Sequence, residues 1–347
     1  MGQMTDVVSA DDRMFILAGF ADALPDPCLL LDRRSLVVHR NSAAARDFPE
    51  VAVGGLLTSL LRNPVLSGAI EAARRTTETQ TVEVHRTVPN ETWHRVHVAP
   101  LPADGMLAVT FQSLTEERRM NQLRSDFIAN ASHELRTPLT SLIGFIDTLL
   151  GPAAKDEAAR ERFLNIMRQQ AARMSNLIDD LLSLSRIEMR QHLRPTGTVD
   201  LPLLIREVAD GFEAQAAEAG VKLTVTAPAS APVTGERGEL YEVVENLVDN
   251  AIKYGGDGGL VEVTVTPGRL GYDYALTVTD HGAGIEQQHV PRLTERFYRV
   301  DAESSRKKKG TGLGLAIVKH IVNRHRGQLS IRSKPGEGTR VEILLHK

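Results

Sequence analysis

The stretch of sequence that decides the fold runs from Phe127 to Leu139 and reads FIANASHELRTPL. From there to Gly151-Pro152, apolar residues recur at alternating spacings of three and four, which indicates a long helix with a coiled-coil-like seam. The seam positions are Ile128, Ser132, Leu135, Leu139, Leu142, Ile146 and Leu149. His133 lies just off this seam, so we expect its imidazole to face solvent.

The neighbours of His133 indicate what this imidazole does. Thr137 lies one turn along the same outer face. Pro138 removes the backbone hydrogen bond to the carbonyl of Glu134 and crowds it, so we expect a bend at the histidine. Phosphoryl transfer to imidazole needs a neutral ring nitrogen as nucleophile, and Glu134 can accept the other ring proton or hold the tautomer. The Thr137 hydroxyl can position a water for the reverse, hydrolytic reaction.

A second run of the same kind follows between Phe163 and Leu184. Two such helices form only a hairpin, and its seams stay half exposed. Two hairpins paired across a two-fold axis close a four-helix bundle. We therefore expect residues 114–192 to form a dimeric helical domain and the protein to be a homodimer. The alternative is a hairpin that packs on another domain of the same chain.

The quoted stretch resembles the H-box of bacterial sensor histidine kinases. The resemblance implies that His133 is autophosphorylated and passes the phosphoryl group to an aspartate in the receiver domain of a response regulator. It also implies a domain that binds ATP and Mg²⁺, of the GHKL type. We expect this domain at residues 194–347, where helical and strand patterns alternate and glycine is frequent. Helices on a mostly antiparallel sheet, an α/β sandwich, fit that pattern.

The segment Asn246 to Tyr254, NLVDNAIKY, resembles the N-box of that domain. Asn246 and Asn250 are four residues apart, so one helix face presents two amide oxygens, and oxygen ligands suit Mg²⁺. The resemblance implies that Asn250 is the metal ligand, that Lys253 contacts phosphate and that Tyr254 flanks the base or ribose.

Two glycine-rich segments resemble the other nucleotide boxes. In DHGAG, the Asp280 carboxylate can accept from the adenine amino group, while Gly282 and Gly284 let the backbone approach the base. The segment GTGLG precedes a helical run, so backbone amides can face phosphates. Its residues are Gly310, Thr311, Gly312, Leu313 and Gly314.

Between these boxes, Glu295 to Arg299 resembles the F-box, with Arg299 a candidate contact for the transferring phosphate. Residues Ser304 to Lys309 are expected to form a cationic lid. The runs from Leu293 to Asp301 and from Lys309 to His320 resemble the phosphate-regulon sensor kinase, PhoR type. That resemblance implies a PhoB-like regulator.

Residues 12–113 show short β-rich runs separated by turns. Two strands, short helices and three more strands resemble the order of a PAS sensor domain, and Ser113 to Glu116 resembles its exit motif. The family usually has Asp where this chain has Ser113. The expected fold is thus a multidomain α+β protein with a PAS-like sensor, a helical phospho-acceptor domain and an ATP-binding sandwich.

Composition excludes several classes of protein. Lys and Arg total 41 against 44 Asp and Glu, a net charge of −3, which does not favour direct binding of nucleic acid. The single cysteine, Cys28, permits no internal disulfide, so a cytoplasmic, reducing compartment is expected. No apolar run reaches the roughly 18 residues of a membrane span. Attachment to the inner face of the membrane through a missing anchor or a partner stays open.

Two alternatives to a kinase deserve comparison. A GHKL ATPase that drives conformational change places a glutamate where this chain has Asn246, and the adjacent Glu245 points about 100° away on a helix. The missing carboxylate argues against hydrolysis by this domain. The second alternative is a protein that acts mainly as a phosphatase or scaffold for the regulator. Thr137 permits a phosphatase activity, while His133 and the full set of boxes argue against an inactive kinase.

Overall fold

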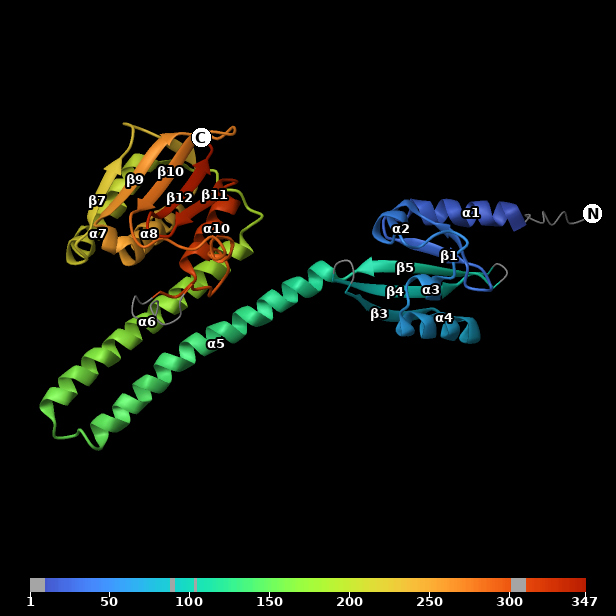
Figure 1. Ribbon diagram of the computed structural model, residues 1–347, viewed down its shortest axis with the longest axis horizontal. Coiled ribbons are helices and arrows are strands. Elements are labelled where there is room, and N and C mark those ends of the chain that lie inside the picture. The colour runs from blue at the N-terminus through green and yellow to red at the C-terminus, as the bar shows by residue number, and fades with distance from the viewer. Residues whose placement is uncertain (1–9, 88–90, 103–104, 301–309) are drawn as a thin grey trace, which may run out of the picture. The chain divides into compact units, whose positions relative to one another are not determined.

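The computed structural model describes residues 10–87, 91–102, 105–300 and 310–347 (Figure 1). The chain divides into two compact units, Met1–Asp126 and Phe127–Lys347. Within the described residues, no helix is both long enough and apolar enough to cross a membrane.

The first unit is built on a five-stranded antiparallel sheet. Its elements are α1 (Ala10–Ala23), β1 (Cys28–Leu31), β2 (Val37–Arg40), α2 (Ser42–Asp47), α3 (Leu57–Leu60), α4 (Pro64–Thr76), β3 (Gln80–Arg86), β4 (Thr92–Pro100) and β5 (Leu107–Ser113). The strand order is β2-β1-β5-β4-β3. The predicted sequence of two strands, helices and three strands is confirmed, whereas α1 was not predicted.

A buried asparagine holds together the start of this unit. Asn41 is fully buried, and its Oδ1 accepts from the backbone N–H groups of Cys28 (3.0 Å) and Ala44 (2.8 Å). Its Nδ2 donates to three carbonyls that follow α1 or lie at its end, those of Ala21, Leu24 and Asp26. One side-chain amide therefore contacts five backbone groups, of which the N–H groups of Cys28 and Ala44 and the carbonyl of Ala21 are buried.

Two long helices form the hairpin that the seam patterns predicted. Helix α5 (Thr115–Leu150) and helix α6 (Glu157–Met189) run side by side (Figure 1), and Phe145 stacks on Phe163 with ring centroids 5.3 Å apart. Helix α5 stays a single helix through Pro138. Asp156 begins α6, because its Oδ1 accepts from the N–H of Ala159 at 2.9 Å.

The C-terminal part of the second unit is a sandwich of helices on a sheet. Its elements are β6 (Thr198–Asp200), α7 (Leu201–Glu218), β7 (Lys222–Thr226), β8 (Pro232–Thr234), α8 (Arg237–Gly255), η1 (Gly256–Gly258), β9 (Leu260–Pro267), β10 (Tyr274–Asp280), η2 (Val290–Arg292), α10 (Gly314–Arg324), β11 (Gln328–Lys334) and β12 (Gly338–Leu345). The sheet order is β11-β12-β10-β9-β7, and only the β7–β9 pair is parallel. The predicted, mostly antiparallel sandwich is confirmed.

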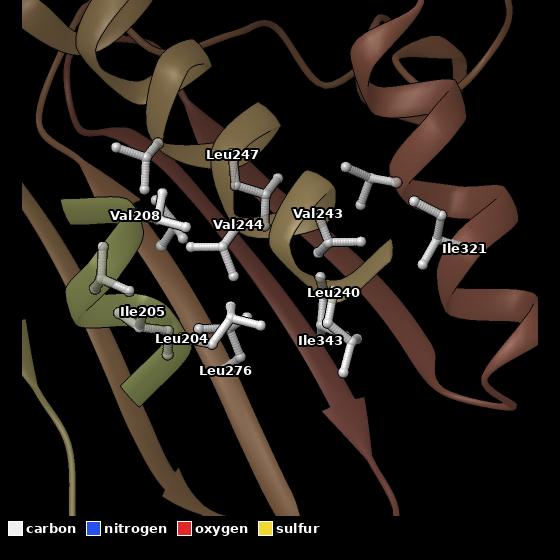
Figure 2. Packing of buried hydrophobic residues seen from close by; sticks show 14 of the residues in the cluster. Leu204, Ile205, Val208, Leu240, Val243, Val244, Leu247, Leu276, Ile321 and Ile343 are labelled. Carbon is white, nitrogen blue, oxygen red and sulfur yellow. The ribbon is translucent and has the colours of Figure 1, made fainter. Parts of the chain in front are cut away.

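The core of this sandwich lies between α7, α8 and α10 on one side and the sheet on the other. Side chains at helical spacing on α8 meet those at alternate positions of the strands (Figure 2). Figure 2 labels Leu204, Ile205, Val208, Leu240, Val243, Val244, Leu247, Leu276, Ile321 and Ile343. The short strands β6 and β8, of three residues each, were not predicted, because so few residues show no period.

The end of α6 is fastened to the sandwich. Leu184 and Ile187 of α6 are buried in the sandwich core, and Arg324 donates from Nε to the carbonyl of Arg190 at 3.3 Å. The same guanidinium pairs with the carboxylates of Glu239 and Glu236. A buried arginine with two carboxylate partners and a carbonyl partner keeps its charge satisfied and holds this joint.

We expect Asn41→Ala to destabilise the first unit by about 3 kcal/mol or more, because several buried backbone groups lose their partner at once. The matched control is Asn63→Ala at the start of α4, where the side chain caps only the N–H groups of Val65 and Leu66. Its loss should be about 1 kcal/mol. Fluorescence of Trp93, the single tryptophan, reports unfolding of this unit in denaturant. Equal losses for the two variants would show that the buried network contributes nothing beyond an ordinary helix cap.

Candidate functional site

The expected phospho-acceptor is accessible. His133 and Thr137 are both exposed on α5, and the Thr137 hydroxyl donates to the carbonyl of His133 at 3.2 Å. The half-buried Glu134 lies next to the histidine in sequence and pairs with Arg173 of α6 at 3.4 Å. The exposed imidazole was predicted, whereas the arginine that orients Glu134 was not, because only the hairpin brings the two helices together.

The predicted seam of α5 divides into two halves. Leu135, Leu142 and Leu149 are half-buried inside the hairpin. Ile128, Leu139 and Ile146 remain exposed at 57%, 47% and 42%. Ile143 and Leu150 of α5 and Leu164, Ile178 and Leu182 of α6 are exposed apolar residues as well. One hairpin therefore leaves an apolar surface on each of its helices uncovered.

The N-box residues lie on α8 and beside one another. Asn246 and Asn250 are half-buried, and Asn246 Nδ2 donates to the carbonyl of Glu242 at 2.9 Å, which leaves its Oδ1 for other partners. Lys253 Nζ donates to Asp249 Oδ2 at 2.5 Å. Tyr254, at 38% exposure, lies at the end of the same helix. The predicted face of two asparagines is therefore present, and Lys253 is paired within the helix.

The expected adenine contact lies against the end of α8. Asp280 ends β10 with 9% exposure, and its Oδ1 accepts from the N–H groups of Gly282 (3.0 Å) and Thr339 (3.2 Å). Burial raises the pKa of Asp280, and these hydrogen bonds oppose that shift. A Cβ at Gly255 would lie 2.5 Å from the Asp280 Cγ, and a Cβ at Gly282 would lie 2.5 Å from the Gly255 Cα. Only glycine permits these approaches.

The phosphate end of the site is the second glycine segment. A Cβ at Gly314, the first residue of α10, would collide with the amide of Asn246, and one at Gly310 would collide with the hydroxyl of Tyr254. Gly312, with φ +75°, passes beside the backbone of Phe297, and Leu313 is fully buried. Gly284, with φ +68°, turns against the carbonyl of Lys334. The N-box, both glycine segments and the F-box therefore meet at one place.

The guanidinium of Arg299, two residues after the Phe297 that lies beside Gly312, is suited to an anionic ligand. Its Nε and Nη2 atoms are buried and have no hydrogen-bond partner. A buried charged donor without a partner is costly, and a phosphate oxygen satisfies such a group well. Among the described residues, no group of three or more His, Cys, Asp or Glu side chains is placed to hold a metal. A Mg²⁺ ion bound here would rely on Asn250, water and phosphate oxygens.

Side chains of α6 also contact the glycine segment, α8 and the F-box, and no pattern in the sequence predicted these contacts. Thr311 Oγ1 donates to Asp180 Oδ2 at 2.7 Å, and Ser183 Oγ donates to Glu242 Oε1 at 2.5 Å. Arg296 of the F-box pairs with Glu188. The expected lid, Ser304 to Lys309, lies outside the described residues.

Two family models match the chain. Residues 235–347 match the histidine kinase-, DNA gyrase B- and HSP90-like ATPase family, and residues 123–190 match the His Kinase A (phospho-acceptor) domain. Together the two models cover just over half of the chain, and the phospho-acceptor domain precedes the ATPase domain. A phospho-acceptor domain followed by this ATPase domain defines a protein-histidine kinase.

Comparison with individual proteins narrows this class. The phosphate regulon sensor protein PhoR of Pseudomonas aeruginosa is 40% identical over 228 residues, which are 66% of this chain and 51% of that protein. The sensor-like histidine kinase SenX3 of Mycolicibacterium smegmatis is 36% identical over 225 residues, or 65% and 58% of the two chains. The chain belongs to the PhoR-like sensor histidine kinases, and these matches span between half and three fifths of the relatives' length.

A solved structure shares the fold across nearly the whole chain. The histidine kinase ThkA, in complex with the response regulator protein TrrA, is 18% identical with a TM-score of 0.50. The match covers 94% of this chain and 97% of that one.

We expect Gly255→Ala to reduce nucleotide affinity at least about tenfold, because its methyl group must displace Asp280, and overpacking costs about 1 to 3 kcal/mol. Gly256→Ala is the matched control, since a Cβ there meets only Val221 Cγ2 at an ordinary 3.5 Å. Titration with a fluorescent ATP analogue measures the affinity, and a thermal melt checks the fold. Similar affinity in both variants would contradict the placement of Asp280 in the site.

Proposed function

We propose that this chain catalyses ATP-dependent phosphorylation of His133 and passes the phosphoryl group to an aspartate of a response regulator. The observation that carries the proposal is the exposed His133 imidazole on a hairpin that shares a compact unit with the nucleotide boxes. The F-box in the same unit carries Arg299, whose Nε and Nη2 atoms are buried and have no hydrogen-bond partner.

In this proposal ATP is the phosphoryl donor, and Mg²⁺ neutralises its phosphates. Asp280 accepts a hydrogen bond from the adenine amino group, and Asn250, together with Asn246, holds the metal-bound phosphate end of ATP. Arg299, the glycine segment at the start of α10 and Lys253 contact the phosphates. Lys253 exchanges its Asp249 partner for a phosphate oxygen. Tyr254 flanks the base or ribose.

At the acceptor, a neutral nitrogen of His133 forms the new N–P bond as the bond to the leaving ADP breaks. The ring then carries an extra positive charge, and Glu134 accepts the proton from the other ring nitrogen. Arg173 keeps the Glu134 carboxylate oriented, because the two pair across the hairpin. Asn246 stands where ATPases of this fold have a catalytic glutamate, so transfer to a side chain is favoured over hydrolysis.

The uncovered apolar surface of the hairpin supports a homodimer. Leu139, Ile143, Ile146 and Leu150 of α5 follow one another at spacings of four and three, and all are exposed in the single chain. A second copy of the same hairpin covers this surface in a four-helix bundle.

The domain organisation and the signalling pathway complete the proposed function. We propose three domains, at residues 12–113, 114–192 and 194–347, the first of them a PAS-like sensor, in line with its strand order β2-β1-β5-β4-β3. We propose a PhoB-like regulator and phosphate signalling, supported by the 40% identity to PhoR.

Replacing His133 with alanine should abolish autophosphorylation and leave nucleotide binding intact, because acceptor and nucleotide residues lie on different elements. Asn250→Ala should instead weaken Mg²⁺-dependent nucleotide binding by on the order of tenfold, the effect of a contact worth about 1.4 kcal/mol. Incubation with γ-labelled ATP and Mg²⁺, followed by a search for acid-labile, base-stable phosphate, makes the measurement. Label retained by the His133 variant would show that another residue is the acceptor.

A second activity, removal of phosphate from the regulator, is favoured by the exposed Thr137 one turn from His133. Thr137→Ala should leave autophosphorylation within a few-fold and slow dephosphorylation of the regulator by on the order of tenfold, because the attacking water loses an orienting contact. Thr140→Ala is the control, since Thr140 is also exposed and donates to the carbonyl four residues before it. Equal dephosphorylation rates for the Thr137 variant and the wild type would remove Thr137 from the mechanism.

The dimer is tested by sedimentation of the full chain at micromolar concentration. The wild type should sediment as a dimer, and Ile146→Lys should shift it toward monomer, because two buried charges would face each other across the axis. Ser141→Lys, at an exposed polar position of the same helix, should have no such effect. A monomeric wild type would refute the four-helix bundle.

A further inference from the structure

In the glycine segment that is expected to face phosphate, the Thr311 hydroxyl is hydrogen-bonded to a carboxylate of α6. Thr311 lies between Gly310 and Gly312, just before α10, and its Oγ1 donates to Asp180 Oδ2 at 2.7 Å. The same hydroxyl also accepts from the N–H of Leu313 at 3.4 Å. The side chain in the middle of the glycine segment is therefore hydrogen-bonded to the helical hairpin.

The surroundings of Asp180 are strongly acidic. Glu242, Glu245 and Asp249 of α8 and the neighbouring Asp179 each interact electrostatically with Asp180, and Lys253 is the basic group that opposes them. Burial raises the pKa of Asp180, while its hydrogen bond to Thr311 and the charge of Lys253 lower it. Negative charge thus accumulates beside the N-box.

A triphosphate at this site brings several further negative charges. Like charges at short range repel, and partial burial reduces the screening by water. The side chain of Asp180 therefore acts against the very ligand that the glycine segment and Arg299 are suited to hold.

The position of Asp180 along α6 adds a second consequence. Arg173, which pairs with Glu134 beside His133, lies seven residues before Asp180 on the same helix. At 1.5 Å per residue this is about 10 Å along the axis. While Thr311 is bound to Asp180, the glycine segment is thus held about two helical turns along α6 from the level of the acceptor.

We propose that Asp180 is a negative determinant of nucleotide affinity, whose contact with Thr311 a bound triphosphate weakens. Binding of ATP and the contact between Asp180 and Thr311 oppose each other, and such coupling is reciprocal. ATP therefore weakens this contact between the glycine segment and α6. This inference rests on the proposed function, because it needs a nucleotide at the glycine segment.

The test compares Asp180→Asn with Asp179→Asn in the full-length chain. Asparagine retains an oxygen that accepts from Thr311 and removes only the charge, while Asp179 is an exposed neighbour on the same helix. Affinities for ATP, ADP and AMP are measured with Mg²⁺ by displacement of a fluorescent ATP analogue. We expect the Asp180 variant to bind ATP roughly five- to tenfold more tightly, ADP with a smaller gain and AMP with none. The Asp179 variant should gain far less, because Asp179 is exposed and water screens its charge.

Comparison of the affinities for ATP, ADP and AMP distinguishes an effect of charge from a structural effect of the substitution. Only an effect of charge grows with the number of phosphates. An equal gain for ATP and AMP, or as large a gain in Asp179→Asn, would overturn the proposal. Unchanged ATP affinity in both Asp180→Asn and Asp180→Ala would also overturn it. Failure of the proposed function looks different, because the wild type would then bind no nucleotide or would keep its affinity when Asn250 is replaced by alanine. Autophosphorylation faster than wild type in Asp180→Asn is the expected companion result.

Discussion

The close approach between the end of α8 and Asp280 is the constraint on which the rest of the nucleotide site depends. The end of α8 lies directly on Asp280, with no room for a side-chain atom at Gly255, and Gly282 returns against the same helix end. This contact fixes where the carboxylate lies relative to the two asparagines one and two turns earlier in α8. The start of α10 closes the other side, because Gly314 lies against Asn246. A single added methyl group at any of these points would separate elements that must act on one ligand.

The elements of the nucleotide site are held at fixed distances inside the sandwich. The hairpin is attached to the sandwich by contacts of different kinds. Leu184 and Ile187 lie in the sandwich core, and Arg324 donates a hydrogen bond to the carbonyl of Arg190, just after α6. Buried apolar contacts and a hydrogen bond thus hold this end of the helix. Leu177, closer to the acceptor than Asp180, is buried in the same core. Polar contacts lie between and beyond these apolar residues: Asp180 to Thr311, Ser183 to Glu242 and Glu188 to Arg296. Polar contacts that water can replace separate at lower cost than buried apolar contacts, so contacts of two strengths alternate along one helix.

Phe127 extends this contact to the first helix. Its ring lies 5.9 Å from that of Phe297 and 5.1 Å beneath the guanidinium of Arg296. Phe297 has a positive φ of 63°, a backbone conformation that costs energy for a residue other than glycine. The F-box therefore contacts both helices of the hairpin through one strained turn. A change in the packing of α5 can reach the nucleotide site by this route.

Much of the site could be predicted from the sequence, because its chemistry depends on short segments. The face of His133 and Thr137 follows from helical spacing, the pair of asparagines follows from a separation of four, and the glycines mark where backbone must approach backbone or ligand. The sandwich followed from strand and helix periods. Its shortest strands did not, and α1 was missed because its residues are apolar on nearly every side and show little periodic signal.

The tertiary structure alone decided which side chains from distant segments meet. Nothing in the local pattern distinguishes Asp180 from its neighbour Asp179, yet one binds the glycine segment and the other is exposed. The same holds for Arg173 beside Glu134, and for the division of the α5 seam into a covered and an uncovered half. Sequence periodicity determines the face of a helix on which a residue lies, since the backbone repeat is local. The partner of that face depends on how the chain returns in space, and that is set by packing between elements far apart in sequence.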